Sequence, residues 1–314
     1  MLQDYQGIVA ASKIPSSTNV IKFSKGDVLL SNIRPYLKKV WYADRDGGCS
    51  ADLFVFKALS ACIPDFLHYV IANDRFINFA MSGAKGVKMP RGDKEQMKTY
   101  EIGLPSIEEQ KKIAKLLSLL DERIATQNKI IDKLQSLIKG IAQNIVRNNK
   151  PNVRLSDCME CNSSTLQESD VYEQGTYPVY GANGIVGYLN NYNTEGEAVY
   201  IIKDGSGVGT VSYVKGKCSA TGTLNTLQAK EGYSLQYLYY LLKAFNFEPY
   251  KTGMAIPHIY FKDYGKAKVF CPSYTEQLQY ARLLSAIDNK LSIEQNILTE
   301  LSLQKQCLLR QMFI

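Results

Sequence analysis

Apolar side chains recur in alternating steps of four and three along residues 104–150, and this spacing predicts one long helix with a continuous apolar stripe. A stripe with a mean period of 3.5 residues keeps facing a partner helix over many turns. Pro105 precedes the stripe, and Ser106-Ile107-Glu108-Glu109 has the Ser-x-x-Glu form of a capping box. We therefore expect a rod of roughly 60 Å. The stripe consists of Ile113, Leu117, Leu120, Ile124, Gln127, Ile131, Leu134, Ile138, Ile141 and Ile145.

The C-terminal residues 272–314 repeat this pattern position by position. Pro105 corresponds to Pro272, and in the same register the capping box returns as Ser273-Tyr274-Thr275-Glu276. Even the polar interruption of the stripe is kept, as Gln127 and Glu294. Agreement in caps, stripe and interruption indicates an internal duplication. The second stripe consists of Tyr280, Leu284, Ile287, Leu291, Glu294, Leu298, Leu301, Lys305, Leu308 and Met312.

The stretches before the two helices, residues 1–103 and 151–271, have the mixed pattern of α+β domains. In the second stretch a strand at 199–202 and a helix at 235–245 follow the same order as in the first. The chain is thus expected to contain two copies of a unit in which a globular domain is followed by a long helix. For the first stretch we expect strands at 20–23, 27–30, 39–42 and 101–104 and one helix over 63–79.

The composition is that of a soluble globular protein, with 45% hydrophobic and 21% charged residues in a chain of 314. No apolar run approaches the roughly 18 residues that span a bilayer, and Met1-Leu2-Gln3-Asp4 lacks the features of a signal peptide. We therefore expect a cytoplasmic protein with no membrane partner and with seven free cysteines.

Cofactor and metal sites are not expected. Cys158-Met-Glu-Cys161 has zinc-ligand spacing, but no second such pair and no histidine pair completes four ligands. The glycine-rich run from Lys203 to Thr210 leads into a strand pattern at 211–214, whereas a nucleotide-binding loop must open a helix. Asn32-Ile-Arg-Pro-Tyr36 has the wrong spacing for a methyltransferase motif, and no nuclease constellation is present, so nothing indicates catalysis.

The formal net charge of +7 suits a phosphate backbone as a partner. The surplus is uneven, because residues 151–271 hold 10 Lys and Arg residues against 11 Asp and Glu residues. We therefore expect DNA binding that is weak when the chain is isolated.

Several motifs together carry a family resemblance. Two variable domains are each followed by a long helix that opens with Leu104-Pro-Ser-Ile-Glu-Glu-Gln110 or Cys271-Pro-Ser-Tyr-Thr-Glu-Gln277. With them go Leu-Leu…Asp segments at 116–121 and 283–288, and the segments 25–36 and 256–263. In this combination the chain resembles the specificity subunit of type I restriction–modification enzymes over almost its whole length.

The resemblance implies an α+β fold in which two long antiparallel helices, paired as a coiled coil, hold apart two target recognition domains with pseudo-twofold symmetry. The domains would be residues 1–103 and 151–271, and the spacer helices 104–150 and 272–314. Each domain would read one half of a split double-stranded DNA sequence. Methyltransferase subunits would dock on the helices and restriction subunits would join that complex, while this subunit is itself not catalytic.

The first domain departs from the family pattern. The segment before Gly26 is much shorter than the segment from Pro151 to Glu195 that precedes Gly196 in the second domain, and it lacks a counterpart of the opening segment 153–157. A second interpretation is therefore a truncated scaffold that dimerises through its helices and no longer reads DNA. A homodimer could then form when the chain is isolated. A third, a stand-alone DNA-modifying enzyme, would require binding of a methyl donor.

Hydrogen-bond donors near glycines and prolines are the candidate DNA contacts. Arginine suits bidentate contact with guanine and asparagine with adenine, whereas lysine mainly meets phosphates. Solvated surface turns are the alternative for all of them. In the first domain the candidates are Ser31, Asn32, Arg34, Lys38 and Lys39 on one turn and Lys85, Lys88 and Arg91 on the loop 82–93. In the second they are Lys203, Ser206, Thr210, Lys251 and His258, with Asn183 and Tyr213 as weaker candidates.

The flanks of the two helices are candidate docking surfaces. Two apolar stripes in one chain pair most simply with each other. Apolar residues beside the stripes remain for a partner subunit, and those predicted to meet the methyltransferase are Ile130, Leu137, Ile297 and Leu309.

Overall fold

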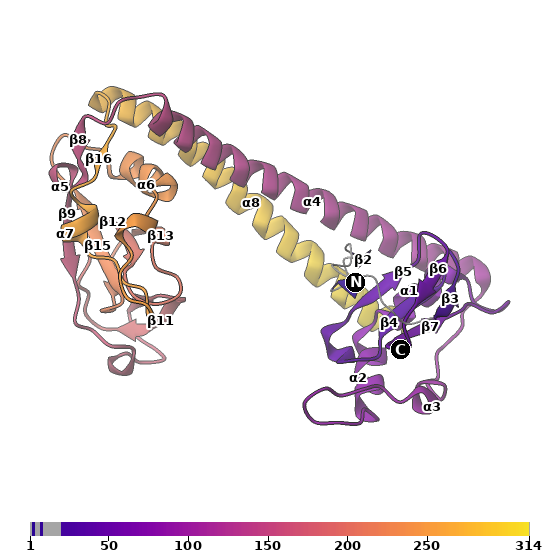
Figure 1. Cartoon of the computed structure of the whole chain (residues 1–314). Coiled ribbons are helices and arrows are strands. Elements are labelled where there is room, and N and C mark those ends of the chain that lie inside the picture. The colour runs from indigo at the N-terminus through magenta and orange to yellow at the C-terminus, as the bar shows by residue number, and fades with distance from the viewer. Residues whose placement is uncertain (1, 4–6, 9–19, 314) are drawn as a thin grey trace. The chain divides into compact units, whose positions relative to one another are not determined.

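A computed structural model describes residues 2–3, 7–8 and 20–313 of the chain (Figure 1). The chain forms two compact units, and each holds one globular domain and one stretch of each long helix. Unit 1 comprises residues 1–128 and 296–314, and unit 2 comprises residues 129–295. The long helices are α4 (Ile107–Arg147) and α8 (Tyr274–Met312). The expected α+β fold, with two long helices and a globular domain that occurs twice, is confirmed.

Both capping boxes form as the sequence predicts. Ser106 N–H and Oγ donate to Glu109 Oε2 at 3.0 and 2.7 Å, and Glu109 N–H donates back to Ser106 Oγ at 3.3 Å. Ser273 and Glu276 make the same three bonds at 3.1, 2.6 and 3.4 Å. Every position of the two apolar stripes is buried or half-buried, including the polar interruptions Gln127 and Glu294.

In unit 1 a small sheet packs on two short helices. The three-stranded sheet has the order β5-β4-β7 with both pairs antiparallel, and a separate pair joins β3 to β6. Residues from β4, β5, α1 and α2, among them Val28, Leu30 and Phe76, form the core between them. The elements are β1 (Leu2–Gln3), β2 (Gly7–Ile8), β3 (Ile21–Phe23), β4 (Val28–Ser31), η1 (Pro35–Leu37), β5 (Val40–Tyr42), β6 (Gly47–Cys49), β7 (Leu53–Phe56), α1 (Pro64–Ile71), α2 (Asp74–Ser82) and α3 (Lys94–Met97).

The two long helices run side by side in opposite directions within unit 1 (Figure 1). Tyr69 of α1, Ala114 and Leu117 of α4, and the α8 residues Leu308 and Leu309 form one apolar cluster. One turn further along α4, Lys305 Nζ donates to Asp121 Oδ1 at 2.5 Å. As residue numbers increase along α4, the residue numbers of the contact partners on α8 decrease. The two helices are therefore antiparallel.

The single helix expected over 63–79 is wrong, because the chain forms α1 and α2 with a break at Asn73. Asn73 is the N-cap of α2, and its side chain accepts a hydrogen bond from Arg75 N–H. Its Nδ2 also donates to Leu309 O of α8 at 3.0 Å. An asparagine that caps a helix and binds a second one fixes a corner that apolar periodicity alone does not reveal.

Unit 2 contains a larger version of the same domain. A four-stranded antiparallel sheet has the order β13-β12-β15-β9, and α6 packs against its first three strands. A second sheet has the order β11-β10-β14. The elements are β8 (Val153–Arg154), α5 (Leu155–Cys158), β9 (Met159–Ser163), η2 (Glu168–Asp170), β10 (Tyr177–Gly181), β11 (Gly184–Leu189), β12 (Glu197–Ile202), β13 (Val211–Lys215), β14 (Ser219–Ala220), β15 (Leu224–Ala229), α6 (Leu235–Ala244), η3 (Glu248–Tyr250), α7 (Phe261–Tyr264) and β16 (Lys268–Val269).

The strand expected at 101–104 is also wrong, since these residues form no ladder. Their counterpart in unit 2 is β16, which pairs with β8 through Lys268–Arg154 and Val269–Val153. In the described part of unit 1 no strand corresponds to β8, so residues 101–104 have nothing to pair with. A strand exists only where a partner supplies its hydrogen bonds.

Candidate nucleic-acid interface

The candidate contacts of unit 1 gather on a turn and a neighbouring loop. Turn 1 (residues 31–39) joins β4 to β5 and is closed by Ser31 N–H donating to Lys39 O at 3.0 Å. Loop 1 (residues 83–92) follows α2 and is closed by a pair of backbone hydrogen bonds between Lys85 and Arg91, both 2.9 Å long. The predicted turn and loop both exist, and each has ends fixed by backbone hydrogen bonds.

The backbones of turn 1 and loop 1 are bonded to each other. Arg34 N–H donates to Pro90 O at 2.8 Å, and Gly92 N–H donates to Asn32 O at 3.2 Å. The Arg34 guanidinium reaches Lys88 O at 3.4 Å. Candidates that lie far apart in the sequence therefore belong to one surface, namely Asn32, Arg34, Lys85, Lys88 and Arg91.

Arg34 has features that folding alone does not require. Its backbone is left-handed, with φ of 53° and ψ of 62°, which disfavours side chains with a Cβ. Its Nε atom and the Oδ1 atom of Asn32 are buried without a hydrogen-bond partner. Strain and unmet hydrogen-bond capacity in adjacent residues are typical of a site that meets a ligand. Both residues are half-buried on a surface turn, and their side chains are of the types that contact base edges.

Unit 2 builds the same arrangement from different residues. Turn 2 (residues 203–210) joins the paired strands β12 and β13, so the predicted hairpin tip is confirmed. Loop 2 (residues 251–258) is closed by a backbone pair between Thr252 and His258 at 2.9 and 2.8 Å. Gly205 N–H donates to Pro257 O at 3.0 Å, as Arg34 does to Pro90. Gly205 also has a positive φ, of 95°, so the position occupied by Arg34 in unit 1 is a glycine here.

Most of the candidate cations already have an acidic neighbour. Lys38 pairs with Asp74 at 2.6 Å, and Lys85 pairs with Asp93 at 2.8 Å. The hydrogen bond from Lys85 to Asp93 raises the pKa of Lys85, so this lysine stays charged. These surface pairs are weak, and a phosphate can replace the carboxylate. Four further contacts of this kind join Arg91 to Asp52, Lys203 to Asp204, Lys251 to Glu248 and His258 Nδ1 to Asp204 Oδ1, at 3.3, 4.0, 2.5 and 2.7 Å.

Two of the weaker candidates lie elsewhere. Asn183 is exposed at the turn between β10 and β11, in the other sheet of unit 2. Tyr213 of β13 faces α6, where its ring lies 5.3 Å from that of Tyr239. Burial and the Glu197 carboxylate raise the pKa of Tyr213. A side chain held between strand and helix is a core contact, so Tyr213 does not belong to the surface of turn 2. Ser206 and Thr210 are exposed on turn 2 itself.

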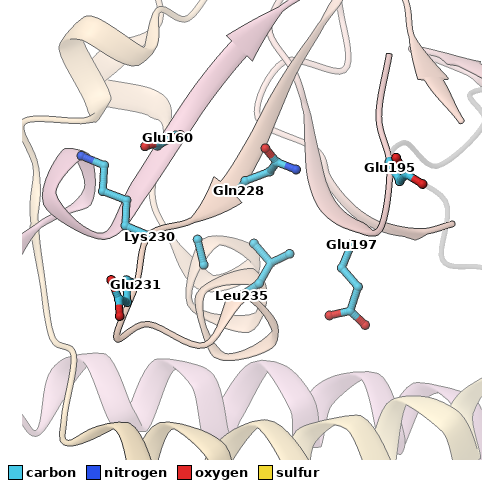
Figure 2. Close-up of a pocket in the computed structure, with 8 residues that line it drawn as sticks. Glu160, Glu195, Glu197, Gln228, Lys230, Glu231 and Leu235 are labelled. Carbon is cyan, nitrogen blue, oxygen red and sulfur yellow. The ribbon is translucent and has the colours of Figure 1, made fainter. Parts of the chain in front are cut away.

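The opposite end of the unit 2 sheet is acidic (Figure 2). A hollow there is lined by the carboxylates Glu160, Glu195, Glu197 and Glu231, with Lys230 as its one lysine. Glu197 begins β12, and turn 2 follows the last residue of that strand. The length of the strand puts roughly 20 Å between the two ends. Glu197 pairs with Lys215 at 2.9 Å and Glu195 with Lys217 at 3.6 Å, so this end keeps only a small negative surplus.

Each globular domain is fixed to its long helix by a buried glutamine, a role that the sequence did not reveal. In unit 1 Gln110 Oε1 accepts from Ile63 N–H at 2.9 Å, and Nε2 donates to Ala61 O and Pro105 O. In unit 2 Gln277 Oε1 accepts from Ser234 N–H at 2.9 Å, and Nε2 donates to Pro272 O. Ile63 and Ser234 are the N-cap residues of α1 and α6. The glutamine of each Glu-Gln motif thus joins the two helices of one repeat.

A tyrosine–aspartate contact repeats further along each long helix. Tyr69 OH donates to Asp121 Oδ2 at 2.9 Å, and Tyr240 OH donates to Asp288 Oδ2 at 3.3 Å. Burial and the nearby carboxylate raise the pKa of both tyrosines. The Leu-Leu…Asp segments therefore provide the second attachment of domain to helix.

The candidate docking residues differ in exposure. Ile130 and Leu137 are 36% and 48% exposed on α4, whereas Ile297 is half-buried. Leu309 packs in the apolar cluster of unit 1 with Tyr69 and Leu117, so much of its surface meets its own chain. Leu116 and Leu283, which occupy equivalent positions in the repeat, are 41% and 50% exposed.

Among the described residues no three His, Cys, Asp or Glu side chains are placed to share a metal ion. No helix in residues 2–3, 7–8 and 20–313 combines the length and apolarity needed to cross a bilayer.

The sequence matches one protein family twice. Residues 5–136 and 148–303 each match the family described as the type I restriction modification DNA specificity domain. Among curated proteins, the type I restriction enzyme EcoprrI specificity subunit of Escherichia coli is 29% identical over 130 residues. A putative type I restriction enzyme specificity subunit of Haemophilus influenzae is 28% identical over 123 residues. These matches cover 41% and 38% of this chain but only 31% and 32% of the relatives.

Two solved structures share the fold. The type I restriction–modification S subunit from M. genitalium aligns with a TM-score of 0.67 over 98% of this chain and 87% of its own, at 19% identity. A chain from a study of assembly and conformational transition in a type I restriction–modification system aligns with a TM-score of 0.58, over 94% and 84%, also at 19% identity. At this identity the likeness concerns the fold alone.

Proposed function

Because the chain belongs to the type I restriction modification DNA specificity family, we propose that it is the DNA-recognition subunit of a type I restriction–modification complex. One observation supports this most strongly. Both units carry a turn bonded to a Gly–Pro loop through the same backbone contact, from Arg34 to Pro90 and from Gly205 to Pro257. A duplicated surface suits a target with two parts.

Each globular domain reads one half of a bipartite double-stranded DNA sequence. In unit 1 Arg34 and Asn32 address base edges, while Lys39 and Lys88 meet phosphates. In unit 2 Lys203, Ser206 and Thr210 of turn 2 take these roles together with Lys251 and His258 of loop 2. The long helices set the distance between the half-sites.

The helices also carry the partner subunits. Methyltransferase subunits cover the exposed apolar flanks, with Ile130 and Leu137 as contacts and the repeat-related pair Leu116 and Leu283 beside them. Restriction subunits join through that complex. The chain itself performs no catalysis, and its part is to select the site.

Selection from a random pool of duplexes, with the cognate methyltransferase present, tests recognition. A bipartite enriched motif is the expected result. Enrichment of a half-motif alone would mean that the first domain does not read DNA. No enrichment would refute recognition and favour the truncated scaffold.

Docking is tested by light scattering of the chain mixed with the methyltransferase. Leu137→Glu places a charge on the proposed flank and should abolish the shift in mass. Gln135→Glu, at an exposed position of the same helix, is the matched control and should leave it intact. Equal behaviour of the two variants would show that this flank is not the docking surface.

A further inference from the structure

The tips of loops 1 and 2 carry fully exposed apolar side chains. Val87 is 101% exposed and Met254 is 106% exposed, and they occupy equivalent positions in the register that relates the two long helices. Met89 and Ile256, which follow them in the two loops, are 51% and 57% exposed. Apolar side chains that protrude at the same place in both repeats are not explained by packing, because neither tip contacts a core.

The loops hold these tips in a defined shape. The Lys85–Arg91 and Thr252–His258 backbone pairs close each loop at its base. Gly86 and Gly253 have φ of 97° and 88°, values that favour glycine. A Cβ on Gly253 would come within 2.3 Å of Ile256 O, so the tip is too tightly turned for any other residue. A stiff loop loses little conformational freedom when its tip is buried by a partner.

Basic side chains flank both tips, and their carboxylate partners Asp52, Asp93, Asp204 and Glu248 lie outside the two loops. From Gly83 to Gly92 the sequence has three basic residues and no acidic one. Loop 2 has Lys251 and His258 and no acidic residue. Each loop is bonded to the turn that carries the candidate base-reading residues, through Pro90 to Arg34 and through Pro257 to Gly205. An apolar tip with basic flanks suits a DNA groove, where phosphates line both sides and stacked bases form the floor.

We propose that Val87 and Met254 act as apolar wedges that enter the DNA at one base step in each half-site and partly unstack it. This inference rests on the proposed recognition function. Proteins that insert such wedges select steps that unstack easily, so the tips would contribute specificity without hydrogen bonds to bases. Met89 and Ile256 would then cover the edges of the opened step.

The test uses the complex with the methyltransferase and the duplexes recovered from the random pool. Met254→Ser and Val87→Ser remove the apolar tips from positions that contact no core, so folding is preserved. Each should lower affinity for the selected duplex by about ten- to a hundredfold, the range expected when one such side chain no longer leaves water. Leu59→Ser, at another apolar residue that is 79% exposed in unit 1, is the matched control and should leave affinity unchanged.

Unstacking has its own readout. The fluorescent base 2-aminopurine, placed in turn at each step of a half-site, brightens where a neighbouring base is displaced. The parent complex should brighten one step in each half-site, and each serine variant should remove the signal of its own half only.

Other outcomes refute the wedge. Uniformly dark probes with unchanged affinity of the serine variants would overturn it while recognition stands. Loss of methyltransferase binding, seen as a missing shift in mass, would assign the tips to a protein partner instead. Failure of the pool to enrich any sequence would count against recognition itself, not against the wedge alone.

Discussion

The buried glutamines Gln110 and Gln277 offer the sharpest test of how each domain is attached to its helix. Gln110 is fully buried and makes three hydrogen bonds to backbone groups, and Gln277 is 2% exposed and makes two. Replacement by leucine keeps the approximate volume and removes every one of these bonds. Of the residues whose backbone groups lose a partner, Ser234 is buried, Ile63, Pro105 and Pro272 are half-buried, and Ala61 is exposed.

The expected cost follows from the number of groups left without a partner. A buried donor or acceptor without a partner costs about 1–3 kcal/mol. Gln110→Leu leaves Ile63 N–H without its acceptor, while the carbonyls of Ala61 and Pro105 can reach water, so we expect about 1–3 kcal/mol for unit 1. Gln277→Leu affects Ser234 N–H and Pro272 O, and about 2–4 kcal/mol is expected for unit 2. Against a typical stability of about 5–15 kcal/mol, either change is large.

Hydrogen exchange can measure the two effects in the same molecule. Gln110→Leu should speed exchange of the amides of α1 and leave α6 as it was, because α6 lies in unit 2. Gln277→Leu should do the reverse. Gln304→Leu, at an exposed position of α8, is the control and should change neither. Unchanged exchange in α1 of the Gln110 variant would refute the idea that this bond ties domain to helix.

A charged variant separates the loss of hydrogen bonds from a change in shape. In Gln110→Glu the carboxylate still accepts from Ile63 N–H but faces the carbonyls of Ala61 and Pro105. Burial beside two carbonyls favours the protonated form and raises the pKa of the introduced carboxyl above its unfolded value. The folded state then binds more protons, so the variant should recover stability as pH falls towards about 5. The leucine variant should show no such recovery.

Two further predictions concern unit 1. Arg34→Gly should stabilise the unit by about 1 kcal/mol, since it relieves a left-handed backbone, yet lower affinity for the selected duplex tenfold or more. Denaturant unfolding and titration with the duplex check the two effects. A loss of stability together with the loss of affinity would contradict a binding role. Burial lowers the pKa of His68 to about 4, below its unfolded value of about 6.5, so the folded state binds fewer protons than the unfolded state. As pH falls through this range, the free energy of unfolding of unit 1 should therefore decrease by on the order of 1–3 kcal/mol. His68→Phe, which can keep the stacking on Tyr42, should flatten this loss in thermal unfolding at stepped pH, and an unchanged slope would assign it to other groups.

The long helices could be predicted almost completely, because all their signals are local. A capping box specifies where a helix starts from a few neighbouring residues, and a stripe with a fixed period specifies a buried face whatever its partner. Both signals occur in each of the two repeats. Even Gln127 and Glu294, polar residues in an apolar stripe, are buried where the pattern puts them.

The elements that the pattern missed depend on residues far away in the sequence. Residues 101–104 have the composition of a strand, but a strand requires a partner, and only unit 2 provides one in the described part of the chain, namely β8. Asn73 breaks a helix because its side chain binds both α2 and the distant Leu309 O. Tyr213, a weaker candidate DNA contact, follows turn 2 in the sequence, but the alternation of the strand directs its side chain to α6.

The surface formed by Arg34 and loop 1 could be predicted in part. It depends on residues far apart in the sequence, but a comparison of the two repeats points to Arg34. Ser31 is the last residue of β4, and Ile202 is the last residue of β12. When the two repeats are aligned at these strand ends, and not at the long helices, Arg34 corresponds to Gly205. A position that is glycine in one copy and arginine in the other is one where the backbone favours glycine and something else favours arginine. The backbone preference for glycine is seen in the positive φ angles, 53° at Arg34 and 95° at Gly205. Binding to DNA would explain why an arginine occupies this position. The two half-sites should then be read by different chemistry, with Arg34 contacting guanine in one and Lys203 contacting phosphate and base edges in the other.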